Sequence, residues 1–369
     1  MFLCHVKLAF DAKRVFSNPT GLGNYARWLI HHYALQFPSD QLSLFSPKTP
    51  STTPNELVKS NIFIHKYNDP LGLTRIFGMS ERLKGQDVFH GLSNEIPRLK
   101  NFSGKTIVTI HDVIFRVRPQ DYPYIDRKIY DQKVKFACQN ADEILVISKT
   151  TKADVCEFYS VDPNRVKVVY IGVDSRYAVK CSSEELDNIK SRYNLPSEYW
   201  IAVASFHPRK NQEAILEAFQ RISPELRIPI VFTGEGKKRN LILEMAKAKK
   251  LEKWVIPVGH LPIEHLIGML QSSKGLLYPS LYEGFGLPAL EALTSGIPVL
   301  AHKGTSVAEV CGPLGKYVDT RDAEAFSQAI LEMSEFDLTA FIQNPIYSEH
   351  LDQFSAELLM NQLHLIYKR

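Results

Sequence analysis

The chain has 369 residues, of which 44% are hydrophobic and 23% are charged, and this composition excludes a disordered or collagen-like protein. Its length predicts roughly two domains, and its five scattered cysteines argue against a disulfide framework or a zinc knuckle and favour a reducing compartment. Residues 1–174 hold 23 Lys and Arg against 17 Asp and Glu, a net charge of +6. That excess fits an anionic partner such as phosphates or a membrane surface, or else a mixed surface without a partner.

The first ten residues, MFLCHVKLAF, are interrupted by His5 and Lys7, so we do not expect a secretory signal. No apolar run approaches the roughly 18 residues of a membrane-spanning helix. We therefore expect a cytoplasmic protein, at most peripheral on the inner face of the plasma membrane.

Short apolar runs alternate with longer amphipathic segments along the first half of the chain. The predicted strands are Val6–Phe10, Gln41–Phe45, Ile62–His65, Val88–His90, Thr106–His111, Glu143–Ile147 and Val166–Val169. The predicted helices between them are Gly23–Gln36, Tyr122–Gln139 and Thr150–Tyr159.

The second half repeats this rhythm. Its predicted strands are Trp200–Val203, Ile228–Thr233, Val255–Val258, Gly275–Tyr278 and Val299–Ala301, and its predicted helices are Asn211–Arg221, Lys237–Lys249, Ile263–Ser272, Leu287–Ser295 and Ala323–Met333. Strands that alternate with helices of this length predict βαβ units and parallel sheets. The fold class is therefore α/β, with two doubly wound, Rossmann-like domains.

The predicted domain boundary lies after the segment Tyr170–Asp174. Residues 1–174 form the first domain and residues 175–346 the second. The tail, residues 347–369, has apolar residues at helical spacing over Ser348–Lys368, which predicts one amphipathic helix. We expect this helix to pack back on the first domain.

The segment Glu283–Glu291 reads EGFGLPALE and carries the strongest signal for a ligand site. Gly286 lets the backbone approach a ligand closely, and Pro288 suits the first turn of a helix. The free amides of a helix start bind an anion such as phosphate. The carboxylates of Glu283 and Glu291 suit sugar and ribose hydroxyls instead. The alternative is an ordinary strand–turn–helix with solvated acids.

The segment Ala204–Asn211 reads ASFHPRKN and directly follows a predicted strand. Arg209 and Lys210 stand beside a helix start that Asn211 is expected to cap. A guanidinium and an ammonium beside free amides suit a diphosphate. The alternative is a surface Arg-Lys pair.

The segment Thr20–Ala26 reads TGLGNYA and matches a loose dinucleotide fingerprint, Gly-x-Gly-x-x-Ala, at Gly21 and Gly23. About ten residues separate it from the first strand, whereas the fingerprint turn is tight. A loop that closes over a ligand is the alternative.

His111 ends a predicted strand in the segment Thr109–Asp112 and could form a hydrogen bond or transfer a proton, or could be structural. The segment Gly234–Lys237 lacks the spacing of a P-loop. We expect it to be a Gly-rich turn from strand to helix near a bound nucleotide.

In this order the motifs resemble those of retaining glycosyltransferases of family 4, which have the GT-B fold of two Rossmann-like domains facing across a cleft. The resemblance covers nearly the whole chain. It is carried by Gly21–Tyr25, His111–Asp112, Ser148–Asp154, Val169–Asp174, Pro208–Asn211, the pair Glu283 and Glu291, and Gly296–Val299 with Glu309.

The resemblance implies a role for each candidate residue. Glu283 holds the donor sugar together with the backbone of Phe285, Gly286 and Leu287, and Glu291 holds the ribose. Arg209 and Lys210 neutralise the diphosphate, and Ser205 and Gly234 lie at the nucleotide. Gly21 and Gly23 approach the phosphates from the other domain, and His111 lies near the reacting sugar and the acceptor. Some family members have Arg in place of Ser205, so here the neutralisation depends on Arg209 and Lys210.

The expected chemistry follows from electrostatics. A nucleoside diphosphate leaves, the transition state resembles an oxocarbenium ion, and fixed positive groups at the departing phosphate lower the barrier. No Asp-x-Asp motif is apparent, so we expect neither a metal nor a cofactor besides the donor. Retention of the anomeric configuration is implied by the resemblance alone.

The resemblance is greatest to bacterial mannosyltransferases of surface polysaccharide assembly. It implies GDP-mannose as donor and a saccharide or lipid-linked saccharide as acceptor, with UDP-sugars as the alternative donors. Other readings are a sugar-nucleotide 2-epimerase, a phosphorylase, a non-catalytic nucleotide-sugar-binding module, and a nicotinamide dehydrogenase that rests only on Gly21–Ala26. No nucleic-acid partner is expected.

The basic residues of the first half are dense shortly after His111. They are Arg116, Arg118, Arg127, Lys128, Lys133 and Lys135. The helix Tyr122–Gln139 is expected to place Tyr130, Val134 and Ala137 on its apolar side. Such a helix could lie on an anionic membrane and present lipid-linked sugars, or it could be a solvated face.

Overall fold

The computed structural model describes residues 5–18, 21–47, 53–67, 69, 78–236 and 238–368. Parts of the segments considered above, namely residues 1–4, Thr20, Lys237 and Arg369, lie outside these ranges. The chain divides into two units. Unit 1 comprises Met1–Gly172 and Phe354–Arg369, and unit 2 comprises Val173–Gln353. The chain therefore passes between the units at residues 172–173 and 353–354.

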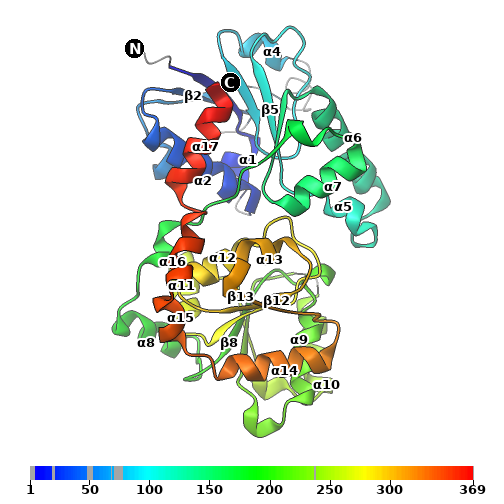
Figure 1. Ribbon diagram of the computed structural model, residues 1–369, viewed down its shortest axis with the longest axis vertical. Coiled ribbons are helices and arrows are strands. Elements are labelled where there is room, and N and C mark those ends of the chain that lie inside the picture. Colours follow the sequence, from blue (N-terminus) through cyan, green and yellow to red (C-terminus); the bar gives the residue numbers. More distant parts are fainter. Residues whose placement is uncertain are drawn as a thin grey trace. The chain divides into compact units, whose positions relative to one another are not determined.

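Unit 1 contains a seven-stranded sheet in the order β3-β2-β1-β4-β5-β6-β7 (Figure 1), and every strand pair is parallel. The strands are β1 Lys7–Asp11, β2 Gln41–Ser46, β3 Ile62–Lys66, β4 Val88–Gly91, β5 Lys105–Ile110, β6 Glu143–Val146 and β7 Val166–Val168. The helices are α1 Lys13–Ser17, α2 Gly21–Gln36, α4 Met79–Arg82, α5 Ile114–Val117, α6 Tyr124–Asn140, α7 Lys149–Tyr159 and α17 Ala356–Lys368. All residues of β4 are buried, as expected for a parallel sheet covered on both faces.

Unit 2 contains a six-stranded sheet in the order β10-β9-β8-β11-β12-β13, again entirely parallel. The strands are β8 Trp200–Val203, β9 Ile230–Thr233, β10 Val255–Gly259, β11 Gly275–Tyr278, β12 Val299–His302 and β13 Gly315–Val318. The helices are α8 Ser183–Arg192, α9 Gln212–Arg221, α10 Arg239–Ala248, α11 Ile263–Gln271, α12 Leu287–Thr294, α13 Ser306–Cys311, α14 Ala323–Ser334, α15 Leu338–Gln343 and α16 Pro345–Asp352. The prediction of two doubly wound parallel sheets is confirmed.

Each sheet has a point where the strand order reverses. In unit 1 the reversal lies between β1 and β4, and in unit 2 between β8 and β11. Loops at the carboxyl ends of such strands form the crevice in which open α/β sheets bind ligands. In unit 2 these loops are the ones that contain Arg209 with Lys210 and Glu283.

The tail differs from the single helix predicted over Ser348–Lys368. It forms α16 and α17, separated at Gln353–Ser355. The break allows Phe354 to enter unit 1, where it is buried and its ring lies 5.3 Å from that of Tyr170. After the break, α17 lies beside α2 (Figure 1).

Further elements depart from the sequence-based prediction, which lacked the short helices α1, α4, α5, α13 and α15. The polar segment that follows residue 181 forms helix α8, which Ser182 and Glu185 start with a reciprocal capping box. Strand β13 was not predicted and occupies an edge of its sheet. None of the described helices is both long and apolar enough to cross a membrane.

Candidate active site

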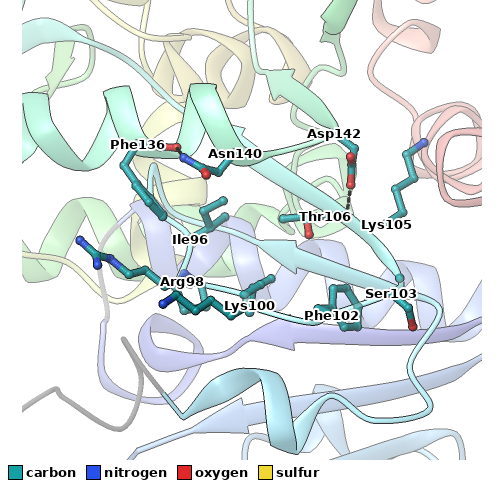
Figure 2. A pocket seen from close by; sticks show the side chains of 13 residues that line it. Ile96, Arg98, Lys100, Phe102, Ser103, Lys105, Thr106, Phe136, Asn140 and Asp142 are labelled. Atoms are coloured by element: carbon teal, nitrogen blue, oxygen red, sulfur yellow. Dashed lines mark hydrogen bonds between the residues drawn. The ribbon is translucent and has the colours of Figure 1, made fainter.

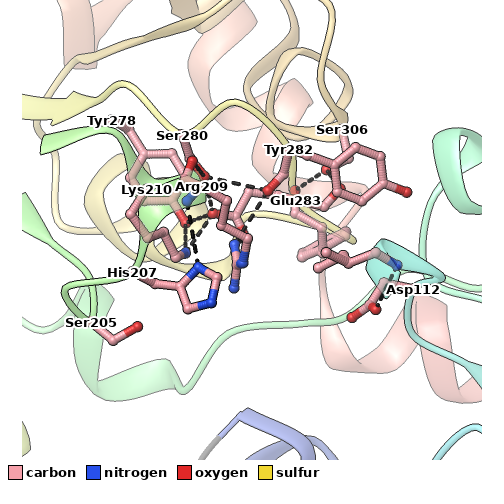
Figure 3. A network of polar contacts seen from close by, with 12 residues as sticks. Asp112, Ser205, His207, Arg209, Lys210, Tyr278, Ser280, Tyr282, Glu283 and Ser306 are labelled. Carbon is pink, nitrogen blue, oxygen red and sulfur yellow. Dashed lines mark hydrogen bonds and ion pairs between the residues drawn. The ribbon is translucent and has the colours of Figure 1, made fainter. Parts of the chain in front are cut away.

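Three charged side chains meet at the reversal point of the unit 2 sheet (Figure 3). Arg209 and Lys210 come from the loop after β8, and Glu283 comes from the loop after β11. Lys210 Nζ donates to Glu283 Oε1 at 2.5 Å, and Arg209 NH1 donates to Glu283 Oε2 at 2.8 Å. The backbone joins the same two loops, because Leu281 N donates to Arg209 O at 2.8 Å.

Two hydroxyl groups complete the surroundings of the Glu283 carboxylate. Ser280 Oγ donates to Oε1 at 2.5 Å and Tyr278 OH donates to Oε1 at 3.0 Å. Burial alone would raise the pKa of Glu283, but the charges of Lys210 and Arg209 and the hydrogen bonds from Lys210 and Ser280 lower it to about 2. Glu283 is therefore ionised at neutral pH. Its Oε2 accepts a hydrogen bond from Arg209 and has a further lone pair for a ligand hydroxyl.

The turn after Glu283 is shaped by Gly286. Its φ is +103°, and a Cβ there would lie 2.8 Å from Val307 Cγ2. Ser306 Oγ donates to the carbonyls of Glu283 and Phe285 at 2.7 and 3.1 Å. Helix α12 begins directly after this turn at Leu287, as predicted. Pro288 has no amide hydrogen and Ala289 N donates to Gly286 O at 2.9 Å, so the helix start offers an anion mainly the positive end of its dipole.

Glu291, one turn further along α12, has a different partner. Its side chain forms a hydrogen bond with Tyr177. Burial raises the pKa of Glu291 to about 7; the Tyr177 bond opposes this shift and the charge of Asp174 adds to it. The two predicted glutamates thus differ in protonation, since Glu283 is fully ionised at neutral pH and Glu291 is near its midpoint.

The loops after β8 and β9 lie against each other at Ser205 and Gly234. Phe206 N donates to Glu235 O at 3.1 Å. Gly234 has a φ of +98°, and a Cβ there would lie 2.5 Å from Ala204 O, so close packing of the two loops requires glycine. Ser205 is exposed.

The predicted cap by Asn211 is wrong. Asn211 occupies the N-cap position of α9 with a left-handed backbone, φ 53° and ψ 36°, and its side chain forms no capping bond. Its Nδ2 instead donates to Thr320 Oγ1 at 3.4 Å. The left-handed turn follows from the short helical turn Pro208–Lys210, which ends directly before it.

In unit 1, His111 follows β5 and is buried. Its Nε2 donates to Leu92 O at 2.8 Å and its backbone N donates to Asn94 Oδ1 at 2.6 Å. Burial lowers the pKa of His111 to about 4, an effect that the Leu92 hydrogen bond opposes and the charge of Arg14 strengthens. The ring is therefore neutral at pH 7, with Nδ1 as a hydrogen-bond acceptor.

The two glycines at the start of α2 differ. A Cβ on Gly23 would lie 1.8 Å from Asn18 O, whereas a Cβ on Gly21 would have no atom within 4 Å. Packing against Asn18 is thus sufficient to explain glycine at position 23. At position 21 no neighbouring atom of the protein would contact a Cβ, so packing within the protein does not require glycine there.

Sequence reasoning missed the hydroxyl groups that hold the two glutamates, on Tyr278, Ser280 and Tyr177. Tyr278 and Ser280 stand at the end of β11, so their position directly after an apolar strand was an available signal. Tyr177 lies in a short helical turn, Ser175–Ala178, and no comparable pattern marks it.

A hollow of about 770 Å³ lies elsewhere in unit 1 (Figure 2). It is lined by residues of the β4–β5 connection and of α6, including Arg98, Lys100, Phe136 and Asn140. Lys105 and Thr106, at the beginning of β5, also line it. His111 follows the carboxyl end of β5, whereas the hollow lies at the amino end of that strand, so the two lie at opposite ends of the strands.

Two family models match consecutive parts of the chain. "Glycosyltransferase Family 4" matches residues 21–177 and "Glycosyl transferases group 1" matches residues 183–340. Together they span most of the chain. The chain belongs to the family 4 glycosyltransferases. This confirms the family resemblance and the prediction that the protein is an enzyme that transfers glycosyl groups.

Several curated relatives are mannosyltransferases by name. The chain is 25% identical to O-antigen chain mannosyltransferase B of Escherichia coli, over 98% of this chain and 100% of that protein. It is 33% identical to the serotype-specific mannosyltransferase WbdA of Escherichia coli. That match covers 58% of this chain and 27% of the longer WbdA protein. It is 30% identical to the MMP alpha-(1->4)-mannosyltransferase of Mycolicibacterium hassiacum, over 49% of this chain and 42% of that protein.

Solved structures share the fold of this glycosyltransferase. A glycosyltransferase from Rickettsia africae matches with a TM-score of 0.77 at 18% identity, over 99% of this chain and 98% of that one. A sucrose-phosphate synthase from Thermosynechococcus elongatus matches with a TM-score of 0.76 at 19% identity, also over 99% and 98%. At these identities the likeness establishes the fold, which is GT-B.

Proposed function

We propose that this glycosyltransferase transfers mannose from GDP-mannose, with retention and without a metal ion, to a saccharide or lipid-linked saccharide of a cell-surface polysaccharide. The names of the relatives support mannose and polysaccharide assembly. The observation that carries the proposal is the cluster of the half-buried Arg209 with the buried Lys210 and Glu283 at the reversal point of the unit 2 sheet.

The cluster suits the departure of a nucleoside diphosphate. Two cations face one carboxylate, so these three side chains together have a net positive charge. The start of α12 follows Glu283 closely in sequence and adds the positive end of the helix dipole. Charges held in place before the reaction stabilise the diphosphate as it leaves with little reorganisation. In this scheme the structure of the loops, and no divalent ion, supplies the positive charge.

The carboxylates divide the remaining recognition between them. Glu283 has an acceptor position on Oε2 for a hydroxyl of the donor sugar, and the neutral His111 has an acceptor position on Nδ1 for a hydroxyl of the donor sugar or of the acceptor. Glu291 holds the ribose. Glu283, which is ionised, and His111, which is neutral, need no change of protonation state at neutral pH to accept these hydrogen bonds.

A panel of nucleotide sugars tests the proposal. The purified protein is incubated with a mannose-terminated oligosaccharide and GDP-mannose, UDP-glucose, UDP-galactose or UDP-N-acetylglucosamine, and nucleoside diphosphate release and product are measured. We expect acceptor-dependent release of GDP from GDP-mannose, an α-linked product by NMR, and unchanged turnover in excess chelator. Preference for a UDP-sugar would replace the donor assignment. Loss of turnover with chelator, restored by Mg²⁺ or Mn²⁺, would overturn the metal-free scheme.

We further propose that unit 1 contacts an anionic membrane through α6. Tyr124 and Ile125 at the start of α6 are 64% and 70% exposed, and Ile129 and Tyr130 are also exposed. Of the three side chains predicted on the apolar side of α6, Val134 and Ala137 are buried, whereas Tyr130 is exposed although its ring contacts those of Phe115 and Tyr122.

Basic groups accompany these exposed apolar side chains. Arg127 and Lys128 both lie 5.5 Å from the centre of the Tyr124 ring, and both line a surface hollow of about 360 Å³. Arg116 and Lys133, in contrast, pair with Asp131 and Glu95 within the protein. Exposed aromatic and aliphatic side chains beside Lys and Arg suit the headgroup region of an anionic bilayer.

A further inference from the structure

A chain of buried polar groups runs from helix α17 to His111 within unit 1. Tyr367 OH on α17 lies 2.7 Å from His90 Nδ1 at β4. His90 Nε2 lies 2.8 Å from Thr109 Oγ1 on β5, and Thr109 Oγ1 lies 3.2 Å from Tyr25 OH on α2. The Tyr25 ring then meets His111 edge to face, with the ring centres 4.6 Å apart and the planes at 89°. All five residues are buried.

The three hydrogen bonds have a common direction. Burial, together with the neighbouring His111, lowers the pKa of His90 to about 3, so its ring is neutral and donates from one nitrogen while it accepts at the other. If Tyr367 donates to Nδ1, Nε2 donates to Thr109, whose hydroxyl is then free to donate to Tyr25. If instead Nδ1 donates to Tyr367, Nε2 accepts from Thr109, and Tyr25 must donate to the Thr109 oxygen, so every bond is reversed. The hydroxyl orientations of Tyr367 and Tyr25 are therefore linked.

His111 is held from two sides. The loop after β4 fixes it through Leu92 O and Asn94 Oδ1. On the other side it contacts Tyr25, whose hydroxyl is the end of the buried chain. The position of the Tyr25 ring thus depends on polar groups that begin at α17.

We propose that Tyr367 and His90 are positioning residues that set Tyr25 against His111, so that α17 helps to build the unit 1 part of the active site. The inference rests on the proposed function, because it takes His111 to lie beside the reacting sugar. In a buried network each missing partner leaves a polar group unsatisfied, and the remaining groups reorient to recover a hydrogen bond.

Helix α17 has a second hydrogen-bonded anchor that provides a matched control. Tyr33 OH on α2 donates to Asp40 Oδ2 at 2.8 Å and lies 2.7 Å from His364 Nδ1 on α17. Tyr33→Phe therefore removes a buried tyrosine hydroxyl between the same two helices. It retains the Tyr33 ring, which lies 5.3 Å from that of Tyr367, and it removes none of the three hydrogen bonds between Tyr367 and Tyr25.

The experiment compares Tyr367→Phe with Tyr33→Phe in the whole protein. We expect Tyr367→Phe to lower kcat about fivefold to tenfold, the effect of one lost neutral hydrogen bond, with the KM for the donor unchanged. Tyr33→Phe should retain the wild-type kcat even if it lowers the melting temperature equally. Equal losses of kcat in the two variants would reduce Tyr367 to a structural role and overturn the proposal.

A double-mutant cycle tests the link to Tyr25. If the chain acts as a unit, the loss of kcat in Tyr25→Phe combined with Tyr367→Phe is smaller than the product of the single losses. Independent, multiplicative losses contradict the proposal. Should Tyr367→Phe fail to fold, Thr109→Val interrupts the same chain in its middle and is compared with Tyr33→Phe in the same way.

Imidazole ¹⁵N spectra give a readout that does not depend on transfer. Tyr367→Phe should shift the signals of both His90 and His111, whereas Tyr33→Phe should shift neither. A shift of His90 alone would overturn the proposal. Wild-type turnover in His111→Ala would instead refute the placement of His111 in the proposed function, while the ¹⁵N shifts would still decide whether α17 positions its ring.

Discussion

Lys210 and Glu283 lie 73 positions apart in the sequence, yet Lys210 Nζ is 2.5 Å from Glu283 Oε1. Both are buried, and they come from the two loops at which the strand order of unit 2 reverses. The pair therefore joins the halves of the sheet at the point where a ligand of such a fold binds.

The first prediction concerns removal of one member of this pair. Lys210→Met should lower the free energy of unfolding by about 3–5 kcal/mol, because it leaves a buried carboxylate without its ammonium partner. It should also weaken GDP binding. Adding Glu283→Gln should restore much of the stability but no transfer activity. Chemical unfolding and calorimetry measure the two effects, and a stable single variant with wild-type GDP affinity would remove Lys210 from the site.

The second prediction separates the two glutamates. Glu283→Gln should lower kcat by about a hundredfold or more, an effect of the size seen when one transition-state contact is removed, while GDP still binds. Glu291→Gln should weaken GDP itself and affect kcat less. Steady-state kinetics and calorimetry on both variants provide the comparison. The reverse pattern would exchange the assigned roles of the sugar and ribose carboxylates.

The third prediction follows from the pKa of Glu291, which burial raises from 4.5 to about 7. In the unfolded chain this carboxyl ionises near 4.5, so the folded state binds the extra proton between these values. The contribution of Glu291 to the free energy of unfolding is therefore fully present below pH 4.5 and is lost as the pH rises through 7. Glu291→Gln should gain stability relative to the wild type between pH 5 and pH 8 in urea unfolding. The exposed Glu244→Gln is the control, and a pH-independent difference for Glu291→Gln would contradict the prediction.

The fourth prediction compares Gly21 with Gly23. Gly23→Ala should destabilise unit 1 because its Cβ would clash with Asn18 O, whereas Gly21→Ala has open space and should leave the melting temperature unchanged. If Gly21 approaches the donor phosphates, Gly21→Ala should nevertheless raise the KM for GDP-mannose. Unchanged kinetics in Gly21→Ala would show that nothing in the reaction requires a glycine there.

The fifth prediction tests the membrane surface on α6. The wild type should sediment with anionic liposomes and not with neutral ones, and more strongly at low salt, since each basic residue near such a surface contributes about 1 kcal/mol. Ile125→Glu should abolish this binding. Leu226→Glu, at a position 59% exposed in unit 2, should not. Equal, negligible sedimentation with both liposomes would reject membrane contact without affecting glycosyl transfer.

Most of the strands and the fold class could be predicted because parallel strands are short apolar runs with helices between them. The edge strand β13 was not predicted, because its four residues, Gly315–Val318, are only partly buried and do not form an apolar run. The helix α8 escaped because only Ile189 within it is buried.

The candidate site was predicted in its residues but not in its contacts. The position of Arg209, Lys210 and Glu283 directly after strands was visible in the sequence. The sequence did not show that both cations bind Glu283. These contacts require β8 and β11 to be neighbours in the sheet, and the order of strands along the chain does not reveal that. Likewise, the neutrality of His111 depends on burial that a strand end alone does not imply.

The return of α17 to unit 1 has a consequence for synthesis. The ribosome synthesises β1 to β7 and then all of unit 2 before it synthesises α17. The first sheet is therefore without its final helix while 181 residues, Val173–Gln353, are added to the chain. Domains made first ordinarily fold first. Here the pocket around Tyr33, His90 and Thr109 stays uncovered until α17 is made, and a nascent chain interrupted within unit 2 cannot close it. Such an incomplete chain exposes apolar and polar groups of unit 1 that are buried in the finished protein, and exposed core groups of this kind are what chaperones and proteases act on.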